Sequence, residues 1–104
     1  MSGEIDLEKV RREEIRWRLL KALDAGRPHS VTEALLLAVL DDVHLTVTEL
    51  ELRRELDYLR DRGLVTIKGE ADNDWQADLT RDGIDVVEYT VEVEPGIARP
   101  PKNR

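Results

Sequence analysis

The sequence predicts a single, mostly helical α+β domain with a three-helix core, a two-stranded hairpin and a C-terminal helix. Its 104 residues are enough for one modest hydrophobic core and too few for two. Two patterns in which Ser or Thr is followed three residues later by Glu, at Ser30 and Thr48, precede apolar runs with helical spacing. Two β-prone runs, 64–67 and 75–80, flank the polar turn GEADND, which is typical of a hairpin.

The first helix is predicted from residue 6 to residue 25, because Gly26 and then Pro28 follow it as terminators. One side of this helix carries the residues that we expect in the core, which are Ile15, Leu19, Ala22 and Leu23. Nearly opposite lies a second apolar stripe of Val10, Trp17 and Leu20. A helix that covers only one core does not need a second stripe.

The second helix is predicted to begin at Ser30, where Glu33 completes the spacing of a capping box. Residues 31–40 are almost continuously apolar, so we expect this helix to be buried on several sides and central to the domain. After the polar turn at Asp41, residues 45–47 are predicted to form a short strand.

The third helix starts at a second capping box, formed by Thr48 and Glu51. Its core face is predicted to carry three leucines, Leu52, Leu56 and Leu59. Gly63 supplies the left-handed residue that ends such a helix, and the hairpin follows directly.

The residues after the hairpin are ambiguous, because the β-branched content of IDVVEYTVEV leaves helix and strand nearly balanced. As a helix, this segment would place Ile84, Val87 and Val91 on one face. We expect residues 1–93 to form the domain and the Pro-rich, basic residues 94–104 to form a flexible tail.

The order of these elements, with the motifs RRELDYLRDRGLVTI and LTRDG, resembles the winged helix-turn-helix superfamily over residues 8–90. The closing PGIARPPK also resembles small winged-helix proteins of Mu-like prophages. The resemblance implies a DNA-binding regulatory or accessory protein, with the third helix in the major groove of double-stranded DNA and the hairpin as the wing. The residues that it assigns to DNA contacts are Arg53, Arg54, Tyr58 and Lys68.

The distribution of charge favours a different function for the same surface. The chain has a net charge of -7, and residues 30–97 carry 6 basic and 17 acidic side chains. A nucleic-acid binder normally presents a basic patch to the phosphates. The alternative hypothesis is therefore a protein-interaction module that binds a basic protein partner through an acidic face made of Glu49, Glu51, Asp57 and Asp61.

We expect a homodimer, because winged-helix proteins often pair through their first and last helices. Its candidate interface consists of Val10, Trp17, Leu20, Ile84, Val87 and Val91. The alternative is intramolecular, with the tryptophan covered by the closing helix and the tail.

Sequence motifs for catalysis or metal binding are not found. The chain has no cysteine, and His29 and His44 lack metal-site spacing, so we expect no metal, no cofactor and no enzymatic activity. No secretory leader or membrane-length apolar run is found either, which predicts a cytoplasmic protein without a membrane partner.

Overall fold

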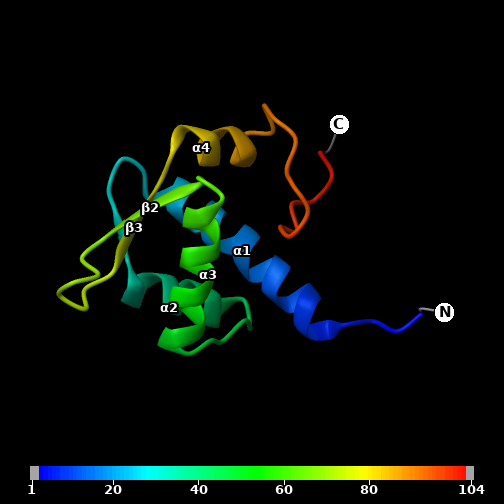
Figure 1. Ribbon diagram of the computed structural model, residues 1–104, viewed down its shortest axis with the longest axis horizontal. Coiled ribbons are helices and arrows are strands. Elements are labelled where there is room, and N and C mark those ends of the chain that lie inside the picture. The colour runs from blue at the N-terminus through cyan, green and yellow to red at the C-terminus, as the bar shows by residue number, and fades with distance from the viewer. Residues whose placement is uncertain (1–2, 103–104) are drawn as a thin grey trace.

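The computed structural model describes residues 3–102 as four helices and a small three-stranded antiparallel sheet (Figure 1). In chain order the elements are α1 (Leu7–Gly26), β1 (Val31–Thr32), α2 (Glu33–Asp42), α3 (Glu49–Asp61), β2 (Val65–Lys68), β3 (Gln76–Leu79) and α4 (Arg81–Val87). The strand order in the sheet is β1-β3-β2. The predicted α+β class, the three-helix core, the hairpin and the closing helix are therefore present.

The central helix is α1, and it contacts α2, α3, α4 and the sheet. Because other elements cover α1 on several sides, it needs apolar residues on more than one face, and this explains its second apolar stripe. Trp17 and Leu20 are buried within the chain, and the Trp17 ring packs edge-on against Tyr89 at 6.2 Å between centroids. Val10 remains exposed. The intramolecular alternative is the one that the structure supports for Trp17 and Leu20, which are too buried to anchor a partner subunit.

The predicted start of α2 at Ser30 is wrong. Val31 and Thr32 pair with β3, with Val31 opposite Ala77, and the helix begins after Thr32, whose side chain accepts from the Leu35 backbone N–H. The Ser30 hydroxyl donates to Asp78 at 2.8 Å and does not cap the helix. Pairing with β3 and this hydrogen bond take residues 30–32 out of the helix, although their spacing matches a capping box.

The expectation that α2 is buried on several sides is also wrong. Leu36 and Leu40 are fully buried, whereas Leu35 lies on the solvent-exposed side of α2. Nor do residues 45–47 form a strand; they are an irregular connection to α3, and the short strand of this domain precedes α2.

From α3 to β3 the predictions are confirmed. The three leucines of the predicted core face are buried, and Gly63 ends the helical segment with φ of +77°. Strands β2 and β3 pair from Val65 opposite Leu79 to Lys68 opposite Gln76. The Thr80 hydroxyl then donates to the Gly63 carbonyl at 2.6 Å and accepts from Gly83 N–H, so it joins the end of α3 to the start of α4.

The C-terminal residues differ from the prediction in two ways. Tyr89 has φ of +63° just after α4, so Val91 lies outside the helix and shares no helical face with Ile84. Residues 94–102 return toward α1 (Figure 1), where Ala98 N–H donates to the Glu13 carbonyl and Ile97 is buried. The folded domain therefore extends past residue 93, and at least Ile97 and Ala98 belong to it.

Candidate functional site

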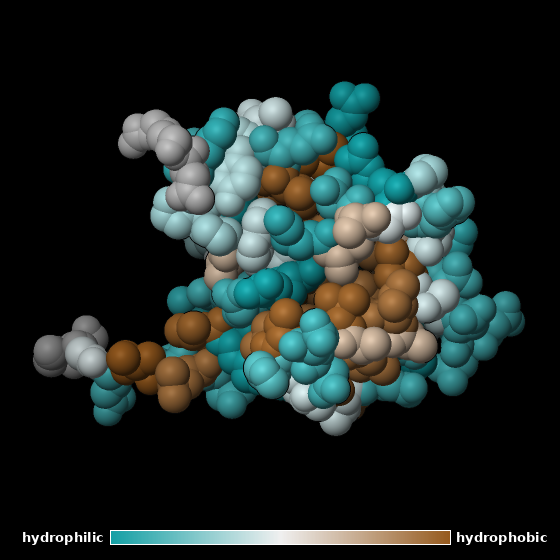
Figure 2. Space-filling model, turned by 180° about the vertical axis from the view of Figure 1, so that it is seen from behind, coloured by the Kyte–Doolittle hydropathy of each residue, from teal (hydrophilic) through white to brown (hydrophobic). Residues whose placement is uncertain are grey.

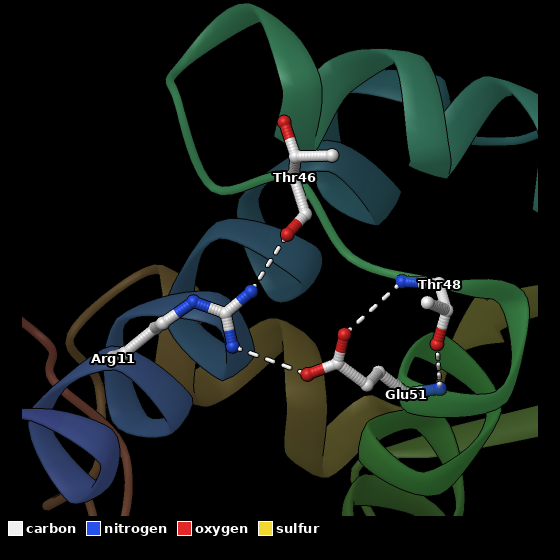
Figure 3. Close-up of polar contacts among 4 residues, drawn as sticks. All are labelled: Arg11, Thr46, Thr48 and Glu51. Atoms are coloured by element: carbon white, nitrogen blue, oxygen red, sulfur yellow. Dashed lines mark hydrogen bonds and ion pairs between the residues drawn. The ribbon is translucent and has the colours of Figure 1, made fainter.

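The N-terminus of α3 is fixed by a network that Figure 3 shows. The Glu51 carboxylate accepts from Thr48 N–H at 3.1 Å, and the Thr48 hydroxyl accepts from Glu51 N–H at 3.1 Å, which is the predicted capping box. Arg11 of α1 donates to Glu51 at 3.2 Å and to the Thr46 carbonyl at 2.6 Å. The Thr48 backbone N–H and then Arg11 lower the pKa of Glu51. The Glu51 carboxylate is therefore already paired with groups of its own domain.

Arg53, a candidate DNA contact, is also occupied. Its Nε and Nη2 donate to the two carboxylate oxygens of Glu33, at 2.5 and 3.0 Å, in a bidentate pair between α3 and the start of α2. Only 22% of the Arg53 side chain and 12% of the Glu33 side chain are exposed. The hydrogen bond to Glu33 raises the pKa of Arg53. The guanidinium would have to leave a well-formed partner in order to reach a phosphate.

The other arginines near the end of α3 are paired in the same manner. Arg60 donates to Glu70 of the hairpin loop at 2.7 Å and to Asp57 one turn earlier. The hydrogen bond to Glu70 is the largest cause of the raised pKa of Arg60. Arg62 donates to Glu94 at 2.9 Å. The hairpin loop thus holds Arg60, and the C-terminal segment holds Arg62.

Tyr58, another candidate DNA contact, faces away from the outer side of α3. Its ring lies between two guanidinium groups, with that of Arg16 at 3.6 Å and that of Arg62 at 4.6 Å from the centroid. A Cβ added at Gly96 would meet the Tyr58 hydroxyl, so the C-terminal segment closes over the ring. The side chain is therefore part of the packing between α1, α3 and the C-terminal segment.

Four side chains remain exposed along the outer side of α3: Glu49, Leu50, Arg54 and Asp61. Leu50 is the most unusual of them, because 59% of this large apolar residue is in contact with solvent. Lys68 is exposed on β2. We use the name outer face for Glu49, Leu50, Arg54 and Asp61.

The predicted sites are thus only partly brought together. Two of the four candidate DNA contacts, Arg54 and Lys68, are exposed. Two of the four residues of the candidate acidic face, Glu49 and Asp61, are also exposed. Glu33 and Glu70 were not predicted from the sequence as partners of the arginines. No local pattern could have identified them, because Glu33 precedes Arg53 by 20 residues and Glu70 follows Arg60 by 10.

Within residues 3–102, His, Asp and Glu side chains do not gather in groups of three or more that could hold a metal ion. In the same part of the chain, no helix combines the length and the apolar character that crossing a membrane requires. Comparison of the chain with protein-family models, with curated proteins and with solved structures finds no match.

Proposed function

We propose that this chain is a winged helix-turn-helix domain that binds a protein partner through the outer face of α3. Support for the fold comes from the order of its elements, in which a short strand precedes α2 and a hairpin follows α3. The sequence motifs that resemble the superfamily coincide with the end of α3, the start of β2 and the N-terminus of α4.

One observation carries the choice of a protein partner. Arg53, Arg60 and Arg62 are held by carboxylates of the same domain, while an exposed leucine, Leu50, stands beside the exposed Glu49 on the outer face. Phosphate neutralisation by basic side chains supplies most non-specific DNA affinity, and here those side chains are largely neutralised already. An apolar anchor surrounded by charge is instead a common arrangement at protein interfaces.

The partner that fits this surface is a basic protein with an apolar recess. The recess would receive Leu50 and its basic surroundings would meet Glu49, while a second basic group about 16 Å further along α3 would meet Asp61. Glu51 and Asp57 contribute less, because Arg11 and Arg60 already pair with them.

DNA binding is the second candidate function, and the exposure of Arg54 and Lys68 favours it. These are the two basic groups of α3 and the hairpin that the structure leaves in contact with solvent and that the resemblance assigns to DNA. The two candidates differ in their response to salt and to substitutions at the outer face.

The experiment is a pair of fluorescence-anisotropy titrations at low and moderate salt. One probe is random-sequence duplex DNA, and the other is a labelled amphipathic peptide with a leucine stripe flanked by arginines. We expect peptide binding that Leu50→Glu or the pair Glu49→Lys and Asp61→Lys abolishes. Leu35→Glu is the matched control, since Leu35 is 55% exposed but belongs to α2.

The opposite pattern would overturn the proposal in favour of DNA. In that pattern the duplex binds at low salt, the affinity falls steeply as salt rises, and Arg54→Ala with Lys68→Ala removes the binding. Retention of peptide binding by Leu50→Glu would also contradict the proposed anchor.

A further inference from the structure

An apolar groove lies between the second half of α1 and α2. Its volume is about 400 Å³, and its walls are lined by Ala22, Ala25, Val31, Leu35, Val39 and Val43. Arg18 and Lys21 stand at its rim. In Figure 2 the view from behind shows apolar surface gathered over the body of the molecule. This groove has no role in the proposed function.

A second exposed apolar group lies at the start of α1. Ile5, Leu7 and Val10 are all largely exposed, and Figure 2 shows this apolar surface projecting beside the N-terminal end. Acidic residues alternate with the first two of them, in the order Glu4, Ile5, Asp6, Leu7, Glu8. We name the segment from Glu4 to Val10 the arm.

The arm complements the groove in both polarity and charge. Its apolar side chains match the apolar walls, and its carboxylates match the basic rim formed by Lys21 and by Arg18, which also pairs with Glu14 of its own helix. The arm cannot fill the groove of its own chain. Leu7 and Ala25 are separated by 18 helical residues of α1, a distance of about 27 Å at 1.5 Å per residue.

We propose that the groove is occupied by the arm of a second copy of this chain, in a dimer whose two α1 helices run antiparallel. Eighteen residues make five turns, so Leu7 and Ala25 lie on the same face of α1, with Glu14 and Arg18 between them. Antiparallel pairing of this face places the arm of each copy on the groove of the other. Glu14 of one copy then faces Arg18 of the other.

This arrangement is self-complementary and closed. A twofold axis relates the two copies, so each arm fills the groove of the other copy. No arm or groove is left over, and assembly therefore stops at the dimer. The interface differs from the one that the sequence predicted, because Val10 belongs to both but Trp17 and Leu20 are buried inside each subunit. Leu50 belongs neither to the groove nor to the arm, so the test is independent of the proposed protein-binding function.

The first test is the mass of the full chain by sedimentation or light scattering across a concentration series. We expect a dimer that dissociates on dilution. Leu7→Glu and Leu35→Glu should each raise the dissociation constant roughly a hundredfold or more, because each dimer buries two copies of the altered side chain. Leu50→Glu is the matched control and should leave the constant unchanged. Both altered positions are exposed in the monomer, and circular dichroism verifies that the variants fold.

The second test uses the absence of cysteine from the chain, which makes each introduced thiol unique. Leu7→Cys and Ala25→Cys variants, mixed and mildly oxidised, should form a disulfide-linked heterodimer faster than either variant alone, since the bond needs Cβ atoms about 4 Å apart. Leu50→Cys should not accelerate linkage to Ala25→Cys. A monomer at every concentration, a dimer insensitive to Leu7→Glu and Leu35→Glu, or faster linkage of Leu7→Cys to itself would each overturn the proposal.

Discussion

The guanidinium Nε of Arg16 lies 2.6 Å from the carboxylate Oε1 of Glu55, and only 13% and 10% of the two side chains are exposed. The same guanidinium donates to the Gly96 carbonyl at 2.9 Å and stacks on Tyr58. Arg16 therefore connects α1, α3 and the C-terminal segment. It holds the buried side of α3 against α1.

Replacing Arg16 with Met should lower the free energy of unfolding by about 3 kcal/mol, because the Glu55 carboxylate would stay covered without its partner. Urea denaturation measures the loss. The matched control is Arg27→Met, which removes the exposed pairs with Asp24 and Glu88 and should cost no more than about 1 kcal/mol. Adding Glu55→Leu to the Arg16 variant should restore most of the stability. Equal losses for the two arginines would contradict the structural role of Arg16.

Ile97→Ala should lower the free energy of unfolding by about 2 kcal/mol, since Ile97 is buried against the core. The measurement is again urea denaturation. Pro101→Ala, at an exposed position in the same segment, should change stability by less than about 0.5 kcal/mol. If Ile97→Ala were as neutral as Pro101→Ala, the C-terminal segment would be the flexible tail that its composition suggests.

How much the sequence predicts depends on whether the signal is local. Thr48 and Glu51 form their capping box as predicted, because both partners lie within one turn and each side chain accepts from the backbone N–H of the other residue. Ser30 has the same spacing to Glu33, but pairing of Val31 with β3 prevails. Local pattern and tertiary pairing compete there, and only the first is visible in the sequence.

The candidate site was harder to predict than the fold for a related reason. Arg53 is suited to a phosphate by its chemistry and by its place on α3, yet Glu33, which is 20 residues away, holds it. Exposure of Leu50 follows from the helical spacing of the buried leucines, and Arg54 follows it on the same side. Helical periodicity thus predicts which residues face outward, whereas the availability of a charge depends on partners from other elements.

Glu51→Gln should destabilise the domain at neutral pH by a few tenths to about 1 kcal/mol, because this partly exposed carboxylate pairs with Arg11. Since the folded-state pKa of Glu51 is below its ordinary value of 4.5, the charge stabilises the fold above that value. The contribution is lost as pH falls through the lowered folded pKa. Thermal unfolding should therefore show a difference from the parent chain at pH 7 that shrinks below pH 4.5. A difference independent of pH would mean that only the capping geometry matters.

Releasing the paired arginines should convert the outer side of α3 into a surface that binds DNA. In a Glu33→Gln, Glu70→Gln variant, Arg53 loses the carboxylate that holds it, and Arg60 keeps only its pair with Asp57. We expect the affinity for random-sequence duplex to rise about tenfold or more. Each freed arginine should steepen the dependence of log affinity on log salt by about 0.9.

The matched control is Asp42→Asn with Glu92→Gln, which changes the net charge equally at exposed positions outside α3 and the hairpin. It should leave the salt slope unaltered, because uniform charge repels DNA weakly at physiological salt while a freed guanidinium contacts phosphate directly. If the affinity for duplex DNA rose equally in both variants, the weak affinity of the parent chain would be due to net charge alone. Tight binding of duplex DNA by the parent chain would mean that the ion pairs of the arginines open on DNA. DNA binding would then replace protein binding as the proposed function.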